Sequence, residues 1–314
     1  MRKPALVGLS LAVAVVLAGC GTARSHPAAT ATPTSGAPTS SAPTVPQRST
    51  SSSGSTPFPT KILVVIEENH SLDQMRAGMP FLSALSDRYG YATDWHALSH
   101  PSEPNYLGIV GGSTFGVTDD HPPAQNTAMI GNAPSVFSQA REAGRTAGTY
   151  AQSMPAPCST VDAYPYAVRH NPWTYFAADR AACMAHDVVT ASFAADARHD
   201  RLPDVGLLIP DVLHDAHDGS LGSADEWLRL MLPPVLASDD FTSGRLVVVV
   251  TADEDDRHSA NTVLTSVLSS RLDRVVADAP LTHYSLTRFI AQVVGVQPLG
   301  AGADAPDLAA AFGL

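Results

Sequence analysis

Two apolar runs that end abruptly in acidic residues constrain the fold of this chain more than any other feature. The first run covers residues 61–66 and is followed by Glu67, Glu68 and Asn69; the second covers 245–252 and is followed by four acidic residues. Continuous runs of β-branched residues are typical of strands buried on both faces, as in a parallel sheet. Because parallel strands end at the same edge, we expect the two polar clusters to meet in a crevice there.

The rest of the folded region alternates between apolar runs and segments with helical spacing. Further strands are expected at 145–151, 205–210 and 262–268, and helices at 79–88, 135–143, 224–236 and 285–294. The stretch 158–183, rich in Pro, Tyr and Trp, is expected to be an irregular insertion. This alternation predicts an α/β fold with a mostly parallel central sheet and helices on both faces.

Ser102 lies between two prolines at the start of an apolar segment. Proline is tolerated in the first turn of a helix, so Pro101 and Pro104 place Ser102 at or just before a helix N-terminus. Unpaired N–H groups and the positive end of the helix dipole at this position stabilise an anion such as phosphate. From these residues alone, Ser102 is interpreted either as an ordinary N-cap or as a nucleophile beside an anion site.

The acidic residues after the two strands have the chemistry of a divalent-cation site. Glu68 and Asp253 offer hard oxygen ligands, and crowded carboxylates repel one another unless a cation lies among them. Adjacent residues of a regular strand point to opposite faces, so Glu68 and Asn69 reach one ion only if the strand has ended and the chain turns there. Residues 255–256 are expected to be solvated or to support the ligands from outside.

The beginning of the chain has the pattern of an export signal. A positively charged start precedes an apolar stretch from residue 5 to 16, and the ending Leu-Ala-Gly-Cys at 17–20 resembles a bacterial lipobox. We therefore expect residues 1–19 to be a lipoprotein-type signal peptide and Cys20 to carry a lipid. An ordinary cleaved signal, in which Cys20 has no role, is the alternative. The apolar stretch is shorter than the ~20 residues that a membrane span requires.

The remaining chain divides by composition. Residues 20–59 are mainly Ser, Thr, Pro and Ala, which predicts a disordered tether, and residues 60–314 are expected to form one folded domain. Two cysteines lie in this domain, Cys158 and Cys183. An even pair in an exported chain predicts a disulfide, and two unrelated buried thiols are the alternative.

The charge of the chain argues against nucleic-acid binding. The formal net charge is −11, and removing residues 1–19 removes Arg2 and Lys3 but no acid, so it becomes −13. Nucleic-acid binding requires a basic face that neutralises phosphates, so no nucleic-acid partner is expected. A phosphorylated small molecule is still compatible with this charge if a metal ion makes the site locally positive.

These motifs together resemble the bacterial phosphoesterase family of secreted acid phosphatases and phospholipases C, within the alkaline-phosphatase-like superfamily. The resemblance covers essentially residues 61–295 and is strongest to secreted acid phosphatases of the mycobacterial type. It is carried by the segments 68–71 (Glu-Asn-His-Ser), 100–106 (His-Pro-Ser-Glu-Pro-Asn-Tyr), 253–254 (Asp-Glu), 217–220 (His-Asp-Gly-Ser) and 283–285 (His-Tyr-Ser).

The resemblance implies a metal site and a nucleophile. The ion would be Ca, Mg, Mn or Zn, and the ligands implied are Glu68, Asn69, Ser102, Asp253 and Glu254. The catalytic residues implied are Ser102 as nucleophile, His217 as hydrogen-bond or proton donor, and Asp218, which orients it. His214 in the same loop competes with His217, which is otherwise a surface residue. His283 would contact phosphate or metal, or merely begin a helix.

The function that follows is an exported, metal-dependent phosphomonoesterase that works through a phosphoserine. Its substrate would be a phosphorylated small molecule or lipid, and a lipid on Cys20 would anchor it to a membrane. One alternative is a phosphodiesterase or phospholipase C on the same scaffold; another is a lipoprotein that binds a phosphorylated ligand without turnover. The segment 255–258 lacks the glycines usual in the phospholipase branch, which favours the acid-phosphatase branch.

Overall fold

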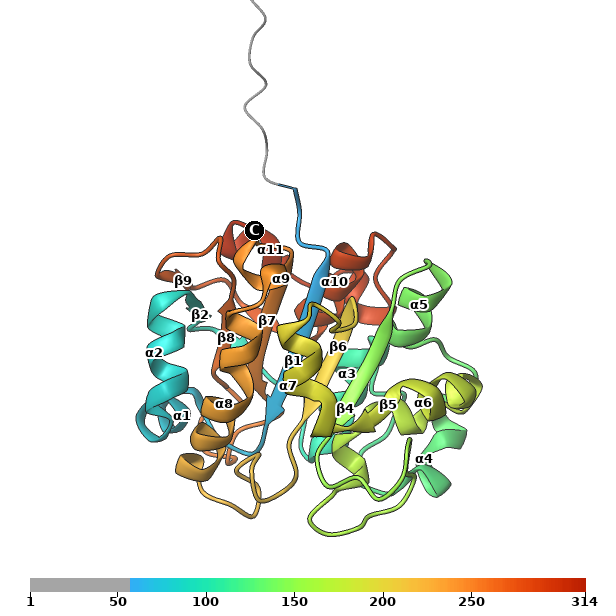
Figure 1. Ribbon diagram of the computed structural model, residues 1–314. Coiled ribbons are helices and arrows are strands. Elements are labelled where there is room, and N and C mark those ends of the chain that lie inside the picture. Colours follow the sequence, from blue (N-terminus) through green and yellow to red (C-terminus); the bar gives the residue numbers. More distant parts are fainter. Residues whose placement is uncertain (1–56) are drawn as a thin grey trace, which may run out of the picture. The chain divides into compact units, whose positions relative to one another are not determined.

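The computed structural model describes residues 57–314. Its centre is an eight-stranded sheet in the order β5-β4-β6-β1-β7-β8-β2-β9 (Figure 1). The strands of this sheet are β1 (Lys61–Glu67), β2 (Gly90–Ala92), β4 (Ala147–Ala151), β5 (Asp187–Val189), β6 (Val205–Ile209), β7 (Leu246–Ala252), β8 (Thr265–Leu268) and β9 (Val275–Ala277). Two short strands, β3 (Trp95–His96) and β10 (Leu281–Thr282), pair separately.

The sheet is mostly parallel, as predicted. Strand β1 lies at its centre and pairs in parallel with β6 on one side and β7 on the other. The strands β4, β5 and β6 continue the parallel arrangement, whereas β8 runs antiparallel to both β7 and β2. All residues of β7 and nearly all of β1 are buried. This burial explains the continuous apolar runs, since a strand covered on both faces has no solvent side.

Helices cover both faces of the sheet. In Figure 1, α7 and α8 lie in front of the central strands and α3 and α10 lie behind them. The α-helices are α1 (Leu72–Gly78), α2 (Pro80–Arg88), α3 (Ser102–Gly111), α4 (Pro123–Ile130), α5 (Val136–Glu142), α6 (Arg180–His186), α7 (Phe193–Arg198), α8 (Leu221–Leu236), α9 (Asp239–Thr242), α10 (His283–Val294) and α11 (Leu308–Phe312). Short 3₁₀ helices are η1 (Val168–His170), η2 (Pro172–Tyr175), η3 (Ala177–Asp179), η4 (Thr190–Ser192) and η5 (Gly300–Ala303).

The expected strands and long helices are present, with shifts at their ends that have local causes. Helix α8 begins at Leu221 rather than 224 because the Ser220 side chain accepts a hydrogen bond from the Ser223 N–H and caps the helix. Helix α1 was not expected, although Ser71 and Gln74 form a capping box that marks its start. Short helices like this one have too few turns to show a clear apolar period.

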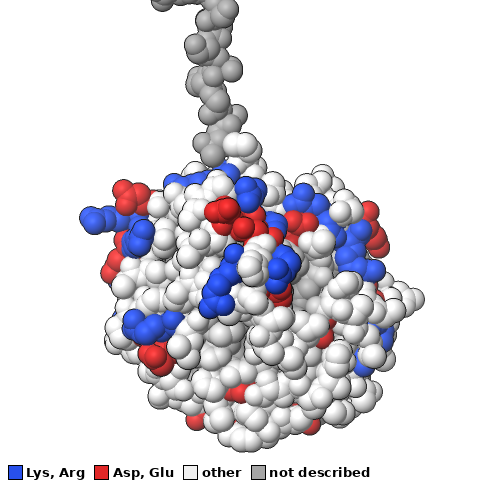
Figure 2. Space-filling model, viewed as in Figure 1, with Lys and Arg blue, Asp and Glu red and all other residues white. Residues whose placement is uncertain are grey.

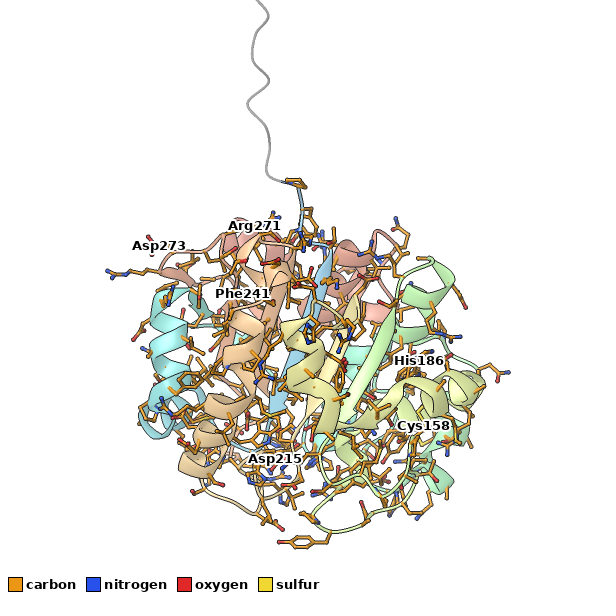
Figure 3. The ribbon with its side chains drawn as sticks, in the orientation of Figure 1. Cys158, His186, Asp215, Phe241, Arg271 and Asp273 are labelled. Atoms are coloured by element: carbon orange, nitrogen blue, oxygen red, sulfur yellow. A yellow bond between two sulfur atoms is a disulfide. The ribbon has the colours of Figure 1, made fainter. Side chains whose placement is uncertain are left out.

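The two edges of the sheet face opposite ends of the domain. The chain enters at Lys61, at the amino end of β1, and the acidic clusters follow the carboxyl ends of β1 and β7. In Figure 3, Asp215 lies at the carboxyl edge, whereas Arg271 and Asp273 lie at the amino edge. These two ends are the carboxyl edge and the amino edge of the sheet.

The stretch 158–183 is the irregular insertion that was expected, built mainly from turns and 3₁₀ pieces until α6 begins at Arg180. A disulfide joins Cys158 to Cys183, with the two Cα atoms 5.5 Å apart, so the predicted pairing is confirmed. The predicted signal peptide (1–19), the lipid site at Cys20 and the tether up to residue 56 lie outside the described residues.

Among residues 57–314, no helix combines the length and the apolar character that a membrane crossing demands.

Candidate active site

The end of β1 makes the turn that two adjacent ligands require. The strand stops at Glu67, and Asn69 has a φ of 54°, in the left-handed region that a non-glycine residue seldom adopts. The Asn69 N–H donates to Asp253 Oδ1 over 3.1 Å, and its side-chain amide donates to Glu68 Oε2 over 3.3 Å. The turn therefore brings the neighbouring side chains Glu68 and Asn69 to the same side.

Ser102 is the first residue of α3, and it does not cap the helix. The N-cap residue is Pro101, and the Ser102 hydroxyl instead donates to Glu68 Oε2 over 3.0 Å. The role of an N-cap is taken by Asp120, whose Oδ1 accepts from the Glu103 N–H over 3.0 Å. Ser102 is 3% exposed and its hydroxyl contacts the end of β1, so the N-cap interpretation of this serine is wrong.

The helix that carries Ser102 is buried along its whole length. Its side chain at Tyr106 donates to Glu68 Oε1 over 2.6 Å, so both oxygens of Glu68 are held by residues of α3. The helix ends at Gly112, whose φ is 66°. A Cβ atom at Gly112 would lie 2.2 Å from the Leu299 carbonyl oxygen, so only glycine allows this close packing. The position of Ser102 is thus fixed from both ends of the helix.

Asp253 and Glu254 follow β7 directly and lie beside Glu68. Asp253 is fully buried, and its Oδ2 has no hydrogen-bond partner among the described residues. Glu254 Oε1 is 3.0 Å from His100 Nδ1, and its Oε2 accepts from Asn105 over 3.3 Å. Burial raises the pKa of Asp253 to about 7, and burial together with the charge of Asp253 raises the pKa of Glu254 to about 9. Crowded, desolvated carboxylates are therefore the dominant feature of this edge.

Asp255 and Asp256 have structural partners. Asp255 is buried, contrary to the expectation of a solvated residue, and it accepts from the backbone N–H groups of Arg257, Ser259 and Asn261. Although burial raises the pKa of Asp255, these three hydrogen bonds bring it below the ordinary value. Asp256 Oδ2 accepts from Gln74 over 2.8 Å. These two residues hold the loop after β7 rather than enter the site.

His283 lies beneath Asp253 with both ring nitrogens engaged. Its Nε2 donates to the Asp253 carbonyl oxygen over 2.6 Å, and its Nδ1 accepts from Trp95 Nε1 over 3.2 Å. The ring is fully buried, and this burial lowers the pKa of His283 to about 4. In this arrangement no nitrogen is open toward a phosphate or a metal, so His283 supports the backbone of Asp253.

His217 and Asp218 lie together on the loop after β6. His217 Nδ1 is 2.7 Å from Asp218 Oδ1, and Nε2 is 3.1 Å from a terminal nitrogen of Arg169. A guanidinium only donates, so Nε2 accepts here and Nδ1 carries the proton toward Asp218. His214 Nδ1 contacts Asp211 Oδ1 at 2.7 Å and Gln152 Nε2 at 3.2 Å instead. Of the two histidines in the loop, His217 is the one that joins the neighbours of Glu68.

The sequence analysis missed His170, which the fold brings to the centre of the site. Its Nε2 lies 3.1 Å from Glu68 Oε1 and its Nδ1 lies 3.0 Å from Asp215 Oδ2, in both cases without hydrogen-bond geometry. The ring stacks on Tyr106 at 5.4 Å, and its centroid is 5.8 Å from that of His217. His170 belongs to the irregular insertion, and no local pattern in that stretch marks it.

The donor set fits a divalent cation. The side-chain oxygens of Glu68, Asn69, Asp253 and Glu254 are hard ligands, and the unpartnered Asp253 Oδ2 is a buried acceptor that lacks a positive neighbour. Cys158, Cys183 and Asp187 also bring ligand-type atoms within 4.8 Å of one another, but the two sulfurs are already joined in the disulfide. A metal therefore fits the carboxyl edge and not the cysteine pair.

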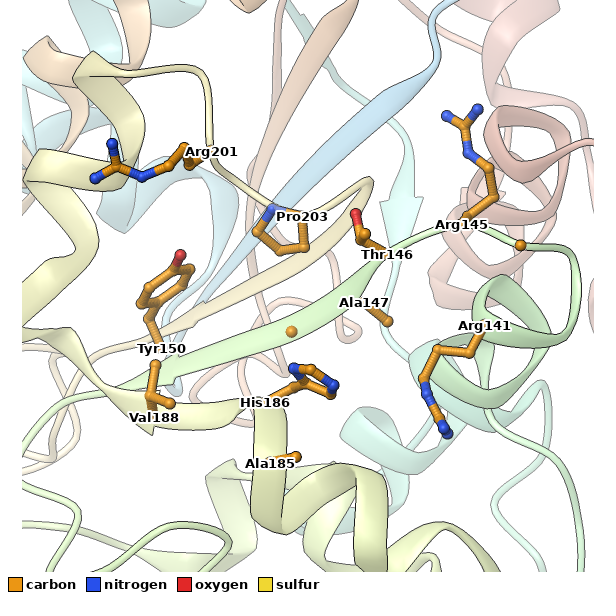
Figure 4. A pocket seen from close by; sticks show the side chains of 12 residues that line it. Arg141, Arg145, Thr146, Ala147, Tyr150, Ala185, His186, Val188, Arg201 and Pro203 are labelled. Carbon is orange, nitrogen blue, oxygen red and sulfur yellow. The ribbon is translucent and has the colours of Figure 1, made fainter.

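A cavity of about 590 Å³ lies at the amino edge, away from all of these residues. Figure 4 shows Arg141, Arg145 and Arg201 at its margin, with His186 and Tyr150 beside β4. Each arginine has an aspartate partner, namely Asp179, Asp204 and Asp196 respectively. The cavity contains none of the predicted site residues, and its volume alone does not make it the active site.

Solved structures share this fold, among them a member of the alkaline phosphatase superfamily. A protein of that superfamily from Vibrio parahaemolyticus superposes with a TM-score of 0.52 at 10% identity, covering 77% of this chain and 68% of that chain. A sulfatase from Pseudoalteromonas sp. gives 0.52 at 8% identity, covering 76% and 68%. These likenesses confirm the predicted alkaline-phosphatase-like fold.

The chain belongs to the phosphoesterase family, whose model matches residues 75–297. It is 31% identical over 272 residues to a phosphatidylinositol-3-phosphatase of Mycobacterium tuberculosis, covering 86% of this chain and 88% of that protein. It is 29% identical over 232 residues to a phosphate-repressible acid phosphatase of Penicillium chrysogenum, covering 70% of this chain and 55% of the relative. The chain thus spans about half the length of this fungal relative. The predicted family is confirmed, and the protein is a hydrolase of phosphoric esters.

Proposed function

We propose that the protein is an exported, metal-dependent phosphomonoesterase in which Ser102 is the nucleophile. The observation that carries the proposal is the placement of the Ser102 hydroxyl, 3.0 Å from Glu68 and buried at the start of α3. The positive end of the α3 dipole lies beside this hydroxyl and would stabilise charge on phosphoryl oxygens. A serine in a carboxylate-lined site, without a histidine bonded to its hydroxyl, fits metal activation better than a histidine–aspartate relay.

The residues that would hold the metal are Glu68, Asn69, Ser102, Asp253 and Glu254. A bound divalent cation would lower the pKa of a coordinated hydroxyl and neutralise developing charge on phosphoryl oxygens. His283 would fix the backbone of Asp253, and Tyr106 would fix Glu68, so that the carboxylates keep their positions. The ion would be Ca, Mg, Mn or Zn, because oxygen ligands suit the first three and a histidine neighbour suits zinc.

The protein's own residues would carry out the transfer in two displacements. Ser102 Oγ forms a bond to phosphorus while the bond from phosphorus to the leaving oxygen breaks, and water then hydrolyses the phosphoserine. The hydroxyl proton of Ser102 already points to Glu68 Oε2. A proton on Nε2 of His217 would be donated to the leaving oxygen, with Asp218 holding the ring through Nδ1.

The substrate proposed is a phosphate monoester on a small molecule or a lipid. The relative named phosphatidylinositol-3-phosphatase supports a monoester on a lipid headgroup as the first class to test. Exposed apolar side chains of the insertion, Val161 and Tyr164, also lie on the loop that carries His170. Export and a lipid on Cys20 are part of the proposal and rest on the N-terminal sequence.

The test compares an aryl phosphate monoester, the matching diester and a phosphorylated lipid as substrates of the wild-type protein and Ser102→Ala. Each assay is run with and without a chelator and after restoring single metals. We expect monoester turnover to fall by at least about 10³-fold in Ser102→Ala and to depend on metal in the wild type. A trapped phosphoserine on Ser102, detected by mass spectrometry, would be present only in the wild type.

Undiminished monoester turnover in Ser102→Ala would rule out Ser102 as the nucleophile. Preference for the diester would instead establish the phosphodiesterase or phospholipase C alternative. Phosphate binding without turnover of any ester would establish a non-catalytic lipoprotein. Activity that survives complete metal removal would rule out the metal dependence. The role of Ser102 would then rest on the result for Ser102→Ala.

A further inference from the structure

Arg169 is a cation beside the site without an acidic partner. Its guanidinium nitrogen lies 3.1 Å from Nε2 of His217, and no carboxylate among the described residues comes within 4.0 Å of it. The arginines that line the cavity at the amino edge behave differently, since Arg141 and Arg201, for example, each pair with an aspartate. A half-buried arginine next to many carboxylates, but joined to none, is available for another anion.

The backbone around Arg169 is held on both sides. The Val168 N–H donates to Asp162 Oδ1 over 2.8 Å, and the Asn171 amide donates to Asp187 Oδ2 over 2.8 Å. The disulfide between Cys158 and Cys183 closes the whole insertion. Arg169 is therefore presented from a fixed short helix, η1, rather than from a free loop tip.

The negative charge of the carboxyl edge repels a phosphate, and the positive charge of Arg169 would offset this repulsion. Glu68, Asp215 and Asp253 are buried within the same site, and their charges repel a phosphate dianion. A divalent cation held by Glu68, Asp253 and Glu254 would carry less positive charge than its ionised ligands carry negative charge. A guanidinium beside the reacting phosphate offsets the remaining repulsion and offers two parallel hydrogen bonds to its oxygens.

We propose that Arg169 binds the phosphoryl group of the substrate and favours dianionic monoesters over diesters. This inference rests on the proposed function, because it places the reacting phosphate between Ser102 and the pair Arg169–His217. In the free protein, the guanidinium donates to Nε2 of His217. In the complex, phosphoryl oxygens accept from the guanidinium, and Nε2 becomes free to hold a solvent-derived proton and donate it to the leaving oxygen.

A monoester and a diester distinguish this role from a structural one. A monoester carries two negative charges near neutral pH and a diester carries one, so loss of a nearby cation weakens the monoester more. A residue that only holds the loop or the His217 ring would affect both substrates equally when it is lost. The ratio of kcat/KM for the two substrates therefore reports on charge recognition and not on folding.

The experiment measures both substrates with Arg169→Ala, Arg169→Lys and the control Arg198→Ala. Arg198 is exposed at the end of α7, without an acidic partner within 4.0 Å among the described residues. For Arg169→Ala we expect about 10- to 100-fold loss of monoester kcat/KM, a smaller loss for the diester, and a similar rise in the inhibition constant of inorganic phosphate. Arg169→Lys should keep part of the preference, and the control should match the wild type.

Equal losses for the two substrates, or an unchanged inhibition constant for phosphate, would overturn the inference while leaving the proposed function intact. Calorimetric titration of inorganic phosphate into the metal-loaded protein gives an independent readout. If no ester is turned over, the proposed function fails, but weaker phosphate binding by Arg169→Ala would still support the phosphate contact. Unchanged phosphate binding in a folded Arg169→Ala variant would contradict it in either case.

Discussion

The two edges of the sheet differ in how their charged side chains are arranged. At the amino edge, arginines line an open cavity and each is paired with an aspartate, for example Arg145 with Asp204. At the carboxyl edge, carboxylates crowd together below the surface, and acceptors such as Asp253 Oδ2 lack a partner. Figure 2 shows Lys and Arg gathered toward the amino edge on the face in view. Crowded buried carboxylates, rather than cavity volume, mark the edge where we place the candidate active site.

The sharpest test of this comparison exchanges one carboxylate at each edge. We expect Asp253→Asn to lower monoester kcat/KM by about 10²-fold or more, because the proposed metal site would lose a ligand and with it several kcal/mol of charge stabilisation. The matched variant Asp204→Asn, at the amino edge, should stay within about twofold of wild type in the same steady-state assay. Comparable losses at the two positions would mean that the edges do not differ in the way described.

The disulfide gives the second test, because it belongs to the insertion that reaches the carboxyl edge. Its loop has a sequence separation of 25, so Cys158→Ser with Cys183→Ser should lower the free energy of unfolding by about 3.5 kcal/mol. We also expect lower monoester kcat, since Arg169 and His170 lie on this loop. Urea unfolding and kinetics of the double variant measure both effects. Full activity in a destabilised variant would show that the site does not depend on the closed loop.

Asp187 and Asp196 should respond to pH in opposite directions. Burial raises the pKa of Asp187 from 3.8 to about 6, so the folded protein keeps a proton that the unfolded chain loses between those values. Its contribution therefore makes unfolding easier as pH rises from about 4 to 6, by about 2 kcal/mol. For Asp196, hydrogen bonds from Ser192 and Arg201 outweigh burial and lower the pKa, so its stabilisation is lost as pH falls below about 4.

Unfolding curves of Asp187→Asn between pH 4 and 7 test the first of these effects directly. We expect the difference in stability between the variant and the wild type to change across pH 4–6 and to be constant above pH 7. Asp196→Asn should show its change only at the acid end. A wild-type profile that Asp187→Asn leaves unaltered would show that this carboxyl group ionises alike in the folded and unfolded states.

The parts of the fold that sequence predicted are those with a local cause. The runs in β1 and β7 are long enough to identify as buried strands, and Pro101 with Pro104 locates the start of α3. The adjacency of Glu68 and Asn69 predicted that the chain turns after β1, and the positive φ of Asn69 is how it does so. Short edge strands such as β9 have too few residues for a pattern.

The parts of the site that sequence did not reveal depend on contacts between distant segments. His170 contacts Glu68 across a separation of about 100 residues, and the sequence around neither residue predicts this contact. His283 has a local motif, but the partners of its two ring nitrogens, Trp95 and the Asp253 carbonyl, come from distant segments of the chain. Residue type predicts which chemistry is possible, whereas the topology decides which side chains are free to perform it.

The course of β1 has a practical meaning for how the enzyme meets its substrate. The chain enters β1 at Lys61, and the candidate site begins at Glu68, just after the other end of the strand. A strand of seven residues places these two ends about 20 Å apart. A lipid, a fusion partner or a bead attached ahead of Pro57 is joined at the amino edge. That edge is opposite the candidate site. The N-terminal segment is therefore a suitable point for immobilisation, because it leaves the carboxyl edge, with the candidate site, facing the solution.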